Sequence, residues 1–291
     1  MKKSFMILAL FVVLTANTFA QRAFDHLTDS INQVLNLSST IQLANFEYNG
    51  SGALWGTYLE AGRTISHSSE YDANIEYLII AAADNPNCDL GLKVHQGRTT
   101  GGPLITRDTN LGPGAVVRFT PRSAGSNTFE LINSGRHGAF ISLVVLRYRR
   151  DARFSFQTLI EALNNTLVVA QQIASLIRPE ALMPPNQWTL FGGNVRTSST
   201  TGFYNAQLAR GNYILVAAGE RSVNNLDVEI VQQHNLNNQD GRVISINSES
   251  SFPIDYGTFD ANSSRYYNLK VINRSSRNPS AFILGFLIQA Y

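Results

Sequence analysis

Cysteine is nearly absent from this chain, because Cys88 is the only one among 291 residues. One cysteine excludes an internal disulfide framework, so stability must come from burial of the hydrophobic residues, which make up 44% of the chain. Cys88 begins a predicted strand, where we expect a small packed side chain and not a reactive thiol. The closely spaced His or Cys pairs of a zinc site are also missing from the sequence.

An excess of charge of one sign is lacking as well. The chain has 23 basic and 21 acidic residues, and two of the basic ones are Lys2 and Lys3 near the start. The remainder of the chain is formally neutral. Since nucleic-acid binding depends on clustered Lys and Arg, we expect no nucleic-acid partner.

Long apolar runs are missing except near the N-terminus, where residues 5–14 follow Lys2 and Lys3. This run has the length of a secretory signal and is followed by a small residue, Ala20. We predict a signal peptide over residues 1–20, an uncleaved anchor being the alternative. The mature chain would be secreted or periplasmic and would have no membrane span.

The chain contains an internal repeat that begins with a helix in each copy. Apolar residues at helical spacing run from Phe24 to Leu37 and again from Phe156 to about Ile177. Leu27 aligns with Leu159 and Asp29 with Glu161, at the same offset in sequence. We therefore expect two domains, over residues 21–150 and 151–291, each starting with its helix.

After each helix come short apolar segments that are separated by Gly, Asn, Ser and Asp turns. This spacing is typical of an all-β sandwich with antiparallel strands. The two copies correspond here again, since Tyr77 aligns with Tyr213 and Asn133 with Asn273. The fold class is therefore mainly β.

The order of these segments is similar to a known family. The first copy has a strand from Tyr77 to Asp84, then Cys88 to Leu92, Phe119-Thr120-Pro121 and Phe129-Glu130-Leu131. This order resembles the bacterial pre-peptidase C-terminal domains, which are small secreted jelly-roll sandwiches. The second copy departs from the pattern at Tyr256, where the Phe-Thr-Pro segment is absent. The resemblance covers the β part of each copy and implies two tandem jelly-roll-like antiparallel β-sandwiches. It also implies a non-catalytic module, and some similar modules bind calcium, carbohydrate or protein.

Two sets of residues are candidates for sites. Asp84 and Asp89 in the first copy, and Glu220 and Asp227 in the second, lie on the same turn and could supply oxygen ligands to calcium. Turn formation by Asp and Asn is the alternative, and we expect no other cofactor. Aromatic residues that could bind a ligand by stacking are Trp55, Tyr58, Trp188 and Tyr204.

No catalytic arrangement emerges, because the sequence has no Gly-x-Ser-x-Gly turn and its histidines are scattered. We therefore expect no enzyme but an exported binding protein that recognises glycan or protein in the bacterial envelope or outside it. One alternative is a structural component of an envelope complex whose helices, through Leu159 and Leu163, contact partners. Another is a hydrolase that uses carboxylates such as Asp89 and Asp227.

Overall fold

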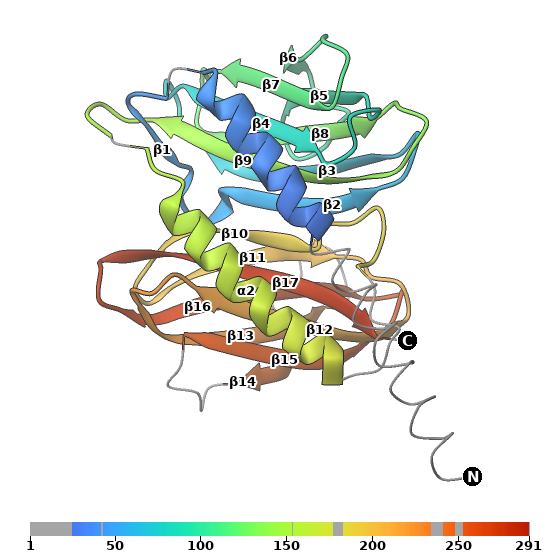
Figure 1. The fold of residues 1–291 in the computed structure, drawn as a ribbon, viewed down its shortest axis with the longest axis vertical. Helices are drawn as coiled ribbons and strands as arrows, with labels where there is room; N and C mark the ends of the chain where they lie inside the picture. Colours follow the sequence, from blue (N-terminus) through green and yellow to red (C-terminus); the bar gives the residue numbers. More distant parts are fainter. Residues whose placement is uncertain are drawn as a thin grey trace, which may run out of the picture. The chain divides into compact units, whose positions relative to one another are not determined.

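The computed structural model describes residues 25–41, 43–152, 154–176, 183–233, 241–247 and 253–290 (Figure 1). The predicted signal peptide lies outside these residues. The chain forms two compact units. The first unit contains His26–Phe156 and Pro185–Asn194, and the second contains the described parts of Gln157–Pro184 and Val195–Tyr291.

The first unit is a jelly roll. Its strands are β1 (Phe46–Tyr48), β2 (Leu54–Leu59), β3 (Thr64–Tyr71), β4 (Tyr77–Ala83), β5 (Leu90–Gln96), β6 (Leu104–Arg107), β7 (Gly114–Phe119), β8 (Gly125–Asn133) and β9 (Ala139–Tyr148), with a short 3-10 helix η1 (Gly50–Gly52) before β2. One sheet has the order β2-β9-β4-β7 and the other β3-β8-β5-β6, all antiparallel. When β2 to β9 are counted from one to eight, these orders are 1-8-3-6 and 2-7-4-5, which is the jelly-roll arrangement.

The second unit repeats this topology. Its strands are β11 (Ser199–Ala206), β12 (Gly211–Gly219), β13 (Val223–Gln233), β14 (Arg242–Asn247), β15 (Ile254–Ala261), β16 (Tyr266–Ser276) and β17 (Ser280–Ala290). Strand β10 (Leu190–Arg196) begins in the first unit, which includes residues up to Asn194, and ends in the second. The orders β17-β12-β15 and β11-β16-β13-β14 match those of the first unit. The aligned asparagines have the same role, because Asn133 Nδ2 donates to Leu59 O at 3.1 Å and Asn273 Nδ2 to Val195 O at 2.9 Å. The predicted mainly-β fold of two antiparallel sandwiches is confirmed.

A helix packs on one face of a sheet in each unit. In the first unit, a helix over residues 25–39 buries Leu27, Ile31 and Val34, and Ser30 Oγ lies 2.7 Å from Ser142 Oγ of β9. The strand β4 is buried along its whole length because the helix side and the opposite sheet cover its two faces. Helical periodicity in the sequence therefore reports packing on the protein's own sheet.

The second helix, α2 (Gln157–Leu176), packs against β12 and β17 of its own unit. Leu159 is 0% and Leu163 is 2% exposed, so both belong to the hydrophobic core. The alternative in which these two leucines contact a partner is therefore not supported, because neither side chain is accessible. Within the described residues, neither helix is long and apolar enough to cross a membrane.

Residues 185–194 follow the second helix in sequence but lie in the first unit. Leu190, Phe191 and Gly192 pair with Gly56, Trp55 and Leu54 of β2. This pairing covers the edge of β2 that would otherwise present free backbone groups. Strand β1 pairs with the end of β9.

Candidate functional site

Two of the predicted ligand-binding aromatics are core residues. Trp55 is 2% exposed and Trp188 is 1% exposed, with their ring centroids 5.6 Å apart. Each indole N–H has a backbone acceptor, Gly52 O at 3.2 Å for Trp55 and Ser66 O at 3.0 Å for Trp188. An exposed stacking platform is excluded at these positions, because large aromatic side chains with satisfied polar groups fill the sandwich core.

The other two aromatics reach the surface. Tyr204 is 46% exposed on β11 of the second unit. Tyr58 lines a cleft of about 460 Å³ in the first unit. The further lining residues that matter for its chemistry are His26, Asp29, Asp84, Asn85 and Phe140. Tyr58 and Asp84, which the sequence placed in different candidate sites, thus meet in one cleft.

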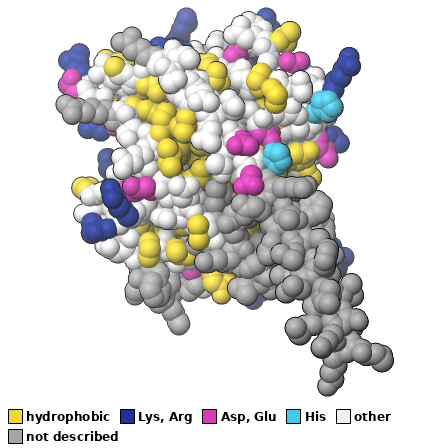
Figure 2. All heavy atoms as spheres, viewed as in Figure 1, with side chains coloured by type: hydrophobic (Ala, Val, Ile, Leu, Met, Phe, Trp, Pro, Cys, Tyr) yellow, Lys and Arg dark blue, Asp and Glu magenta, His cyan; other side chains and the backbone are white. Residues whose placement is uncertain are grey.

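Four segments bring these side chains together. His26 and Asp29 come from the first turns of the helix, Tyr58 from β2, Asp84 from the turn after β4, and Phe140 from β9. That turn is tied to β9, because Asp84 N donates to Phe140 O at 3.0 Å and Phe140 N donates to Asp84 Oδ1 at 2.9 Å. Figure 2 shows acidic side chains and a histidine together beside the N-terminal end of this helix. The cleft is therefore held by backbone hydrogen bonds and not by a free loop.

The carboxylate of Asp84 orients the imidazole of His26. Asp84 Oδ2 lies 2.8 Å from His26 Nδ1, with the Asp84 side chain 9% exposed and the His26 side chain 52% exposed. Burial raises the pKa of Asp84, while hydrogen bonds from Phe140 and the nearby His26 oppose that rise. The ring of His26 also stacks on Phe140, with centroids 5.6 Å apart and planes 3° from parallel.

A second aromatic contact completes the wall of the cleft. The Tyr58 and Phe140 ring centroids are 5.0 Å apart. Gly138 leaves room for this arrangement, because a Cβ there would collide with the Tyr58 hydroxyl. The cleft thus presents three adjacent rings together with the carboxylates of Asp29 and Asp84.

The cleft holds no nucleophile next to its His–Asp pair. A His–Asp pair activates a nucleophile when a serine, threonine or cysteine lies next to the imidazole. None of the residues that line the cleft is Ser, Thr, Cys or Lys. Rings and hydrogen-bonding groups remain, and these can bind a polar ligand with an apolar face.

The predicted calcium ligands are distributed over both units. Asp84 is engaged with His26, while Asp89 does not line the cleft. Glu220 accepts a hydrogen bond from Ser222 Oγ at 2.6 Å, and Asp227 pairs with Arg274. No group of three His, Cys, Asp or Glu side chains that could hold a metal occurs among the described residues.

One observation still bears on calcium in the second unit. Glu220 Oε2, Asn225 Oδ1 and Asp227 Oδ1 are buried without a hydrogen-bond partner. Calcium accepts amide and backbone oxygens as well as carboxylates. The calcium hypothesis for Glu220 and Asp227 stays a prediction.

Sequence reasoning missed His26, Phe140 and Gly138 as parts of the cleft. His26 appeared as one of five scattered histidines, and Phe140 as one residue of an apolar strand. The available signal was the alignment of Asp84 with Glu220, since both acidic residues have the same backbone contact. Glu220 N donates to Phe282 O at 3.0 Å, as Asp84 N does to Phe140 O.

No protein-family model matches the chain, and no curated protein matches it. Among solved structures, the pre-peptidase C-terminal domain of collagenase from Bacillus anthracis is 11% identical with a TM-score of 0.28, covering 33% of this chain and 90% of that domain. The tandem CBM51 modules of a family 98 glycoside hydrolase from Streptococcus pneumoniae are 12% identical with a TM-score of 0.22, covering 81% of this chain and 83% of theirs. A periplasmic inhibitor of g-type lysozyme from Aeromonas hydrophila is 14% identical with a TM-score of 0.28, covering 34% of this chain and 88% of that one. These scores are too low to carry an argument about function.

Proposed function

We propose that this protein is an exported, non-catalytic binding protein and that it recognises a neutral glycan in the cleft of its first unit. The observation that carries the proposal is the convergence of the His26, Tyr58 and Phe140 rings with Asp29 and Asp84 in one cleft of about 460 Å³. The apolar C–H face of a sugar packs on aromatic rings. The hydroxyl groups of the sugar donate hydrogen bonds to carboxylates. An acidic sugar would be repelled by the two carboxylates.

Calorimetric titration of the full chain with neutral oligosaccharides tests this proposal. The Tyr58→Leu variant removes one ring and is expected to weaken binding about tenfold, which corresponds to about 1.4 kcal/mol. Asp84→Asn keeps an acceptor for the Phe140 N–H but loses the charge facing His26, and a similar loss is expected. The first variant thus tests the stacking of the glycan on Tyr58, and the second tests the contribution of the Asp84 carboxylate.

The chain offers matched controls for both variants. Tyr256→Leu changes a tyrosine that is 51% exposed in the second unit, and Asp89→Asn changes a carboxylate that does not line the cleft. Both controls should bind like the wild type. Equal affinity of Tyr58→Leu and Tyr256→Leu would contradict the site, and release of reducing sugar during the titration would contradict a non-catalytic role.

A further inference from the structure

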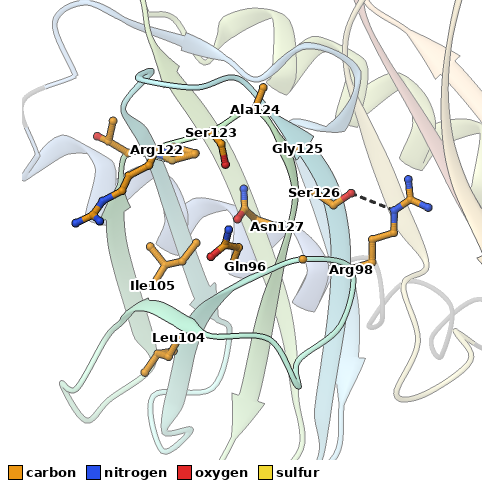
Figure 3. Close-up of a pocket in the computed structure, with 13 residues that line it drawn as sticks. Gln96, Arg98, Leu104, Ile105, Arg122, Ser123, Ala124, Gly125, Ser126 and Asn127 are labelled. Carbon is orange, nitrogen blue, oxygen red and sulfur yellow. Dashed lines mark hydrogen bonds between the residues drawn. The ribbon is translucent and has the colours of Figure 1, made fainter.

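A larger cavity lies elsewhere on the first unit. It has a volume of about 660 Å³ and is formed by the end of β5, by β6, by the connection from β7 to β8 and by the start of β8. Pockets of roughly 300–1,000 Å³ hold small ligands in other proteins. We call this cavity the basin, and Figure 3 shows Gln96 and Asn127 at its centre.

Asn127 is the residue that makes the basin more than a surface hollow. It is 3% exposed, and its backbone lies between Ser69 of β3 and Gln96 of β5 in the sheet. Its side-chain amide lines the basin and has no hydrogen-bond partner among the described residues. A largely buried amide without a protein partner favours a ligand that both donates and accepts a hydrogen bond.

The charge of the basin has one sign. None of its lining residues is Asp or Glu, while Arg98 and Arg122 lie on opposite sides (Figure 3). Arg122 is exposed and forms no ion pair or hydrogen bond with a described residue. Arg98 donates to Ser126 Oγ at 3.2 Å and lies 3.7 Å from Glu70, but this pair is exposed and therefore weak. The guanidinium group of Arg122 is thus available to an anion, whereas that of Arg98 is shared with Glu70.

The rest of the basin suits a hydroxyl-rich ligand with an apolar face. Ser123 and Thr120 add hydroxyl groups to the wall, and Leu104 and Ile105 of β6 are 49% and 38% exposed. An extended peptide would instead add to a free strand edge, and the edges of this sheet are the outer sides of β3 and β6 and not the basin. The polar groups in the basin are side-chain amides and hydroxyls, which match sugar hydroxyls.

We propose that the basin binds a sugar that carries a carboxylate. Arg122 binds the carboxylate, Asn127 and Gln96 exchange hydrogen bonds with the ring hydroxyls, and Leu104 and Ile105 cover the C–H face. This site is separate from the cleft and has the opposite charge preference. The protein therefore has two binding sites of different specificity on one jelly roll.

Binding of trigalacturonic acid to the full chain, measured by calorimetry at low and high salt, tests the proposal. The methyl-esterified trisaccharide is the matched neutral probe, because it keeps the rings and loses the charge. We expect the ester to bind at least tenfold more weakly, and added salt to weaken only the acid. Arg122→Gln should weaken the acid at least tenfold, and Asn127→Asp should abolish its binding by placing a carboxylate in the basin.

Arg136→Gln is the control, because Arg136 is also exposed, has no partner among the described residues and lies outside the basin. It should bind like the wild type. Arg122 is exposed, so its replacement leaves the fold intact and the test stands even if Asn127→Asp unfolds. Equal affinity of the two arginine variants, equal affinity of acid and ester, or tighter binding of a Glu-rich peptide than of the acid would overturn the proposal.

Discussion

The environment of His67 in the fold differs from what its neighbours in sequence indicate. The residue stands among serines in β3, and the sequence shows it only as one of several scattered histidines. Its ring instead packs 3.7 Å from the centroid of Trp55 and 5.5 Å from that of Phe129. Burial among these rings lowers the pKa of His67 to about 3, although the residue keeps some surface exposure. Alternation of polar residues along a strand could not reveal this, because the partners come from other strands.

This shift predicts a loss of stability in mild acid. The pKa of His67 is lower in the folded than in the unfolded state, so the unfolded chain binds the proton first. Its contribution is complete above about pH 6.5 and falls towards pH 3, by at most about 1.4 kcal/mol per pH unit. Urea unfolding between pH 7 and pH 4 should show a smaller slope for His67→Phe than for the wild type.

Asp84 has a raised pKa and contributes a slope of the opposite sign, so only the difference between the two proteins reports on His67. His137→Gln, which changes an exposed histidine, should keep the wild-type slope. Identical slopes for His67→Phe and the wild type would show that the pKa of His67 is the same in the folded and unfolded states.

At the scale of elements, the sequence predicted what depends on local periodicity. Both helices and the strands of both sandwiches were predicted from the spacing of apolar residues, because each element has one apolar face whose residues recur at a fixed interval. Strand β1 was missed because Phe46–Tyr48 is too short to show a period. The pairing of Leu190 to Gly192 with β2 was missed because register across a sheet leaves no local trace.

The packing of α2 gives an element-scale prediction. Leu159 is 0% exposed against the sheet, whereas Val168 on the same helix is 52% exposed. Leu159→Ala should lower the free energy of unfolding by about 2–5 kcal/mol, because it leaves a cavity in the core. Val168→Ala should change it by less than about 0.5 kcal/mol in the same urea titration. An unaffected Leu159→Ala variant would mean that this helix face is not part of the core and would reopen its role as a partner surface.

At the scale of the whole molecule, the sites combine residues that are far apart in the chain. His26 reaches Asp84 and Phe140 only through the jelly-roll order of β2, β4 and β9. The sequence could therefore nominate Tyr58 and Asp84 by residue type, but not their shared cleft. The basin was missed for a similar reason. The sequence shows Asn127 only as a polar residue in a strand, and it does not show that the neighbouring strands leave its amide without a partner.

Residues 185–194 give the prediction at this scale. They supply Trp188 to the core of the first unit, where its ring lies 5.7 Å from Phe129, and they cover the edge of β2. A fragment of residues 21–150 ends at the repeat boundary expected from sequence, but it lacks this segment. The fragment should therefore unfold at a lower temperature than the same unit in the full chain, and it should self-associate through the exposed edge of β2.

A synthetic peptide of residues 185–194 should reverse this effect. Because the peptide binds the folded fragment and not the unfolded one, it should raise the Tm of the fragment in a concentration-dependent manner. The same peptide with Trp188→Ala keeps the backbone pairing with β2 but loses the ring, so it should raise the Tm much less. Calorimetry of the fragment with each peptide measures both effects. A fragment whose Tm is unchanged by the wild-type peptide would show that the first jelly roll closes its core without residues 185–194.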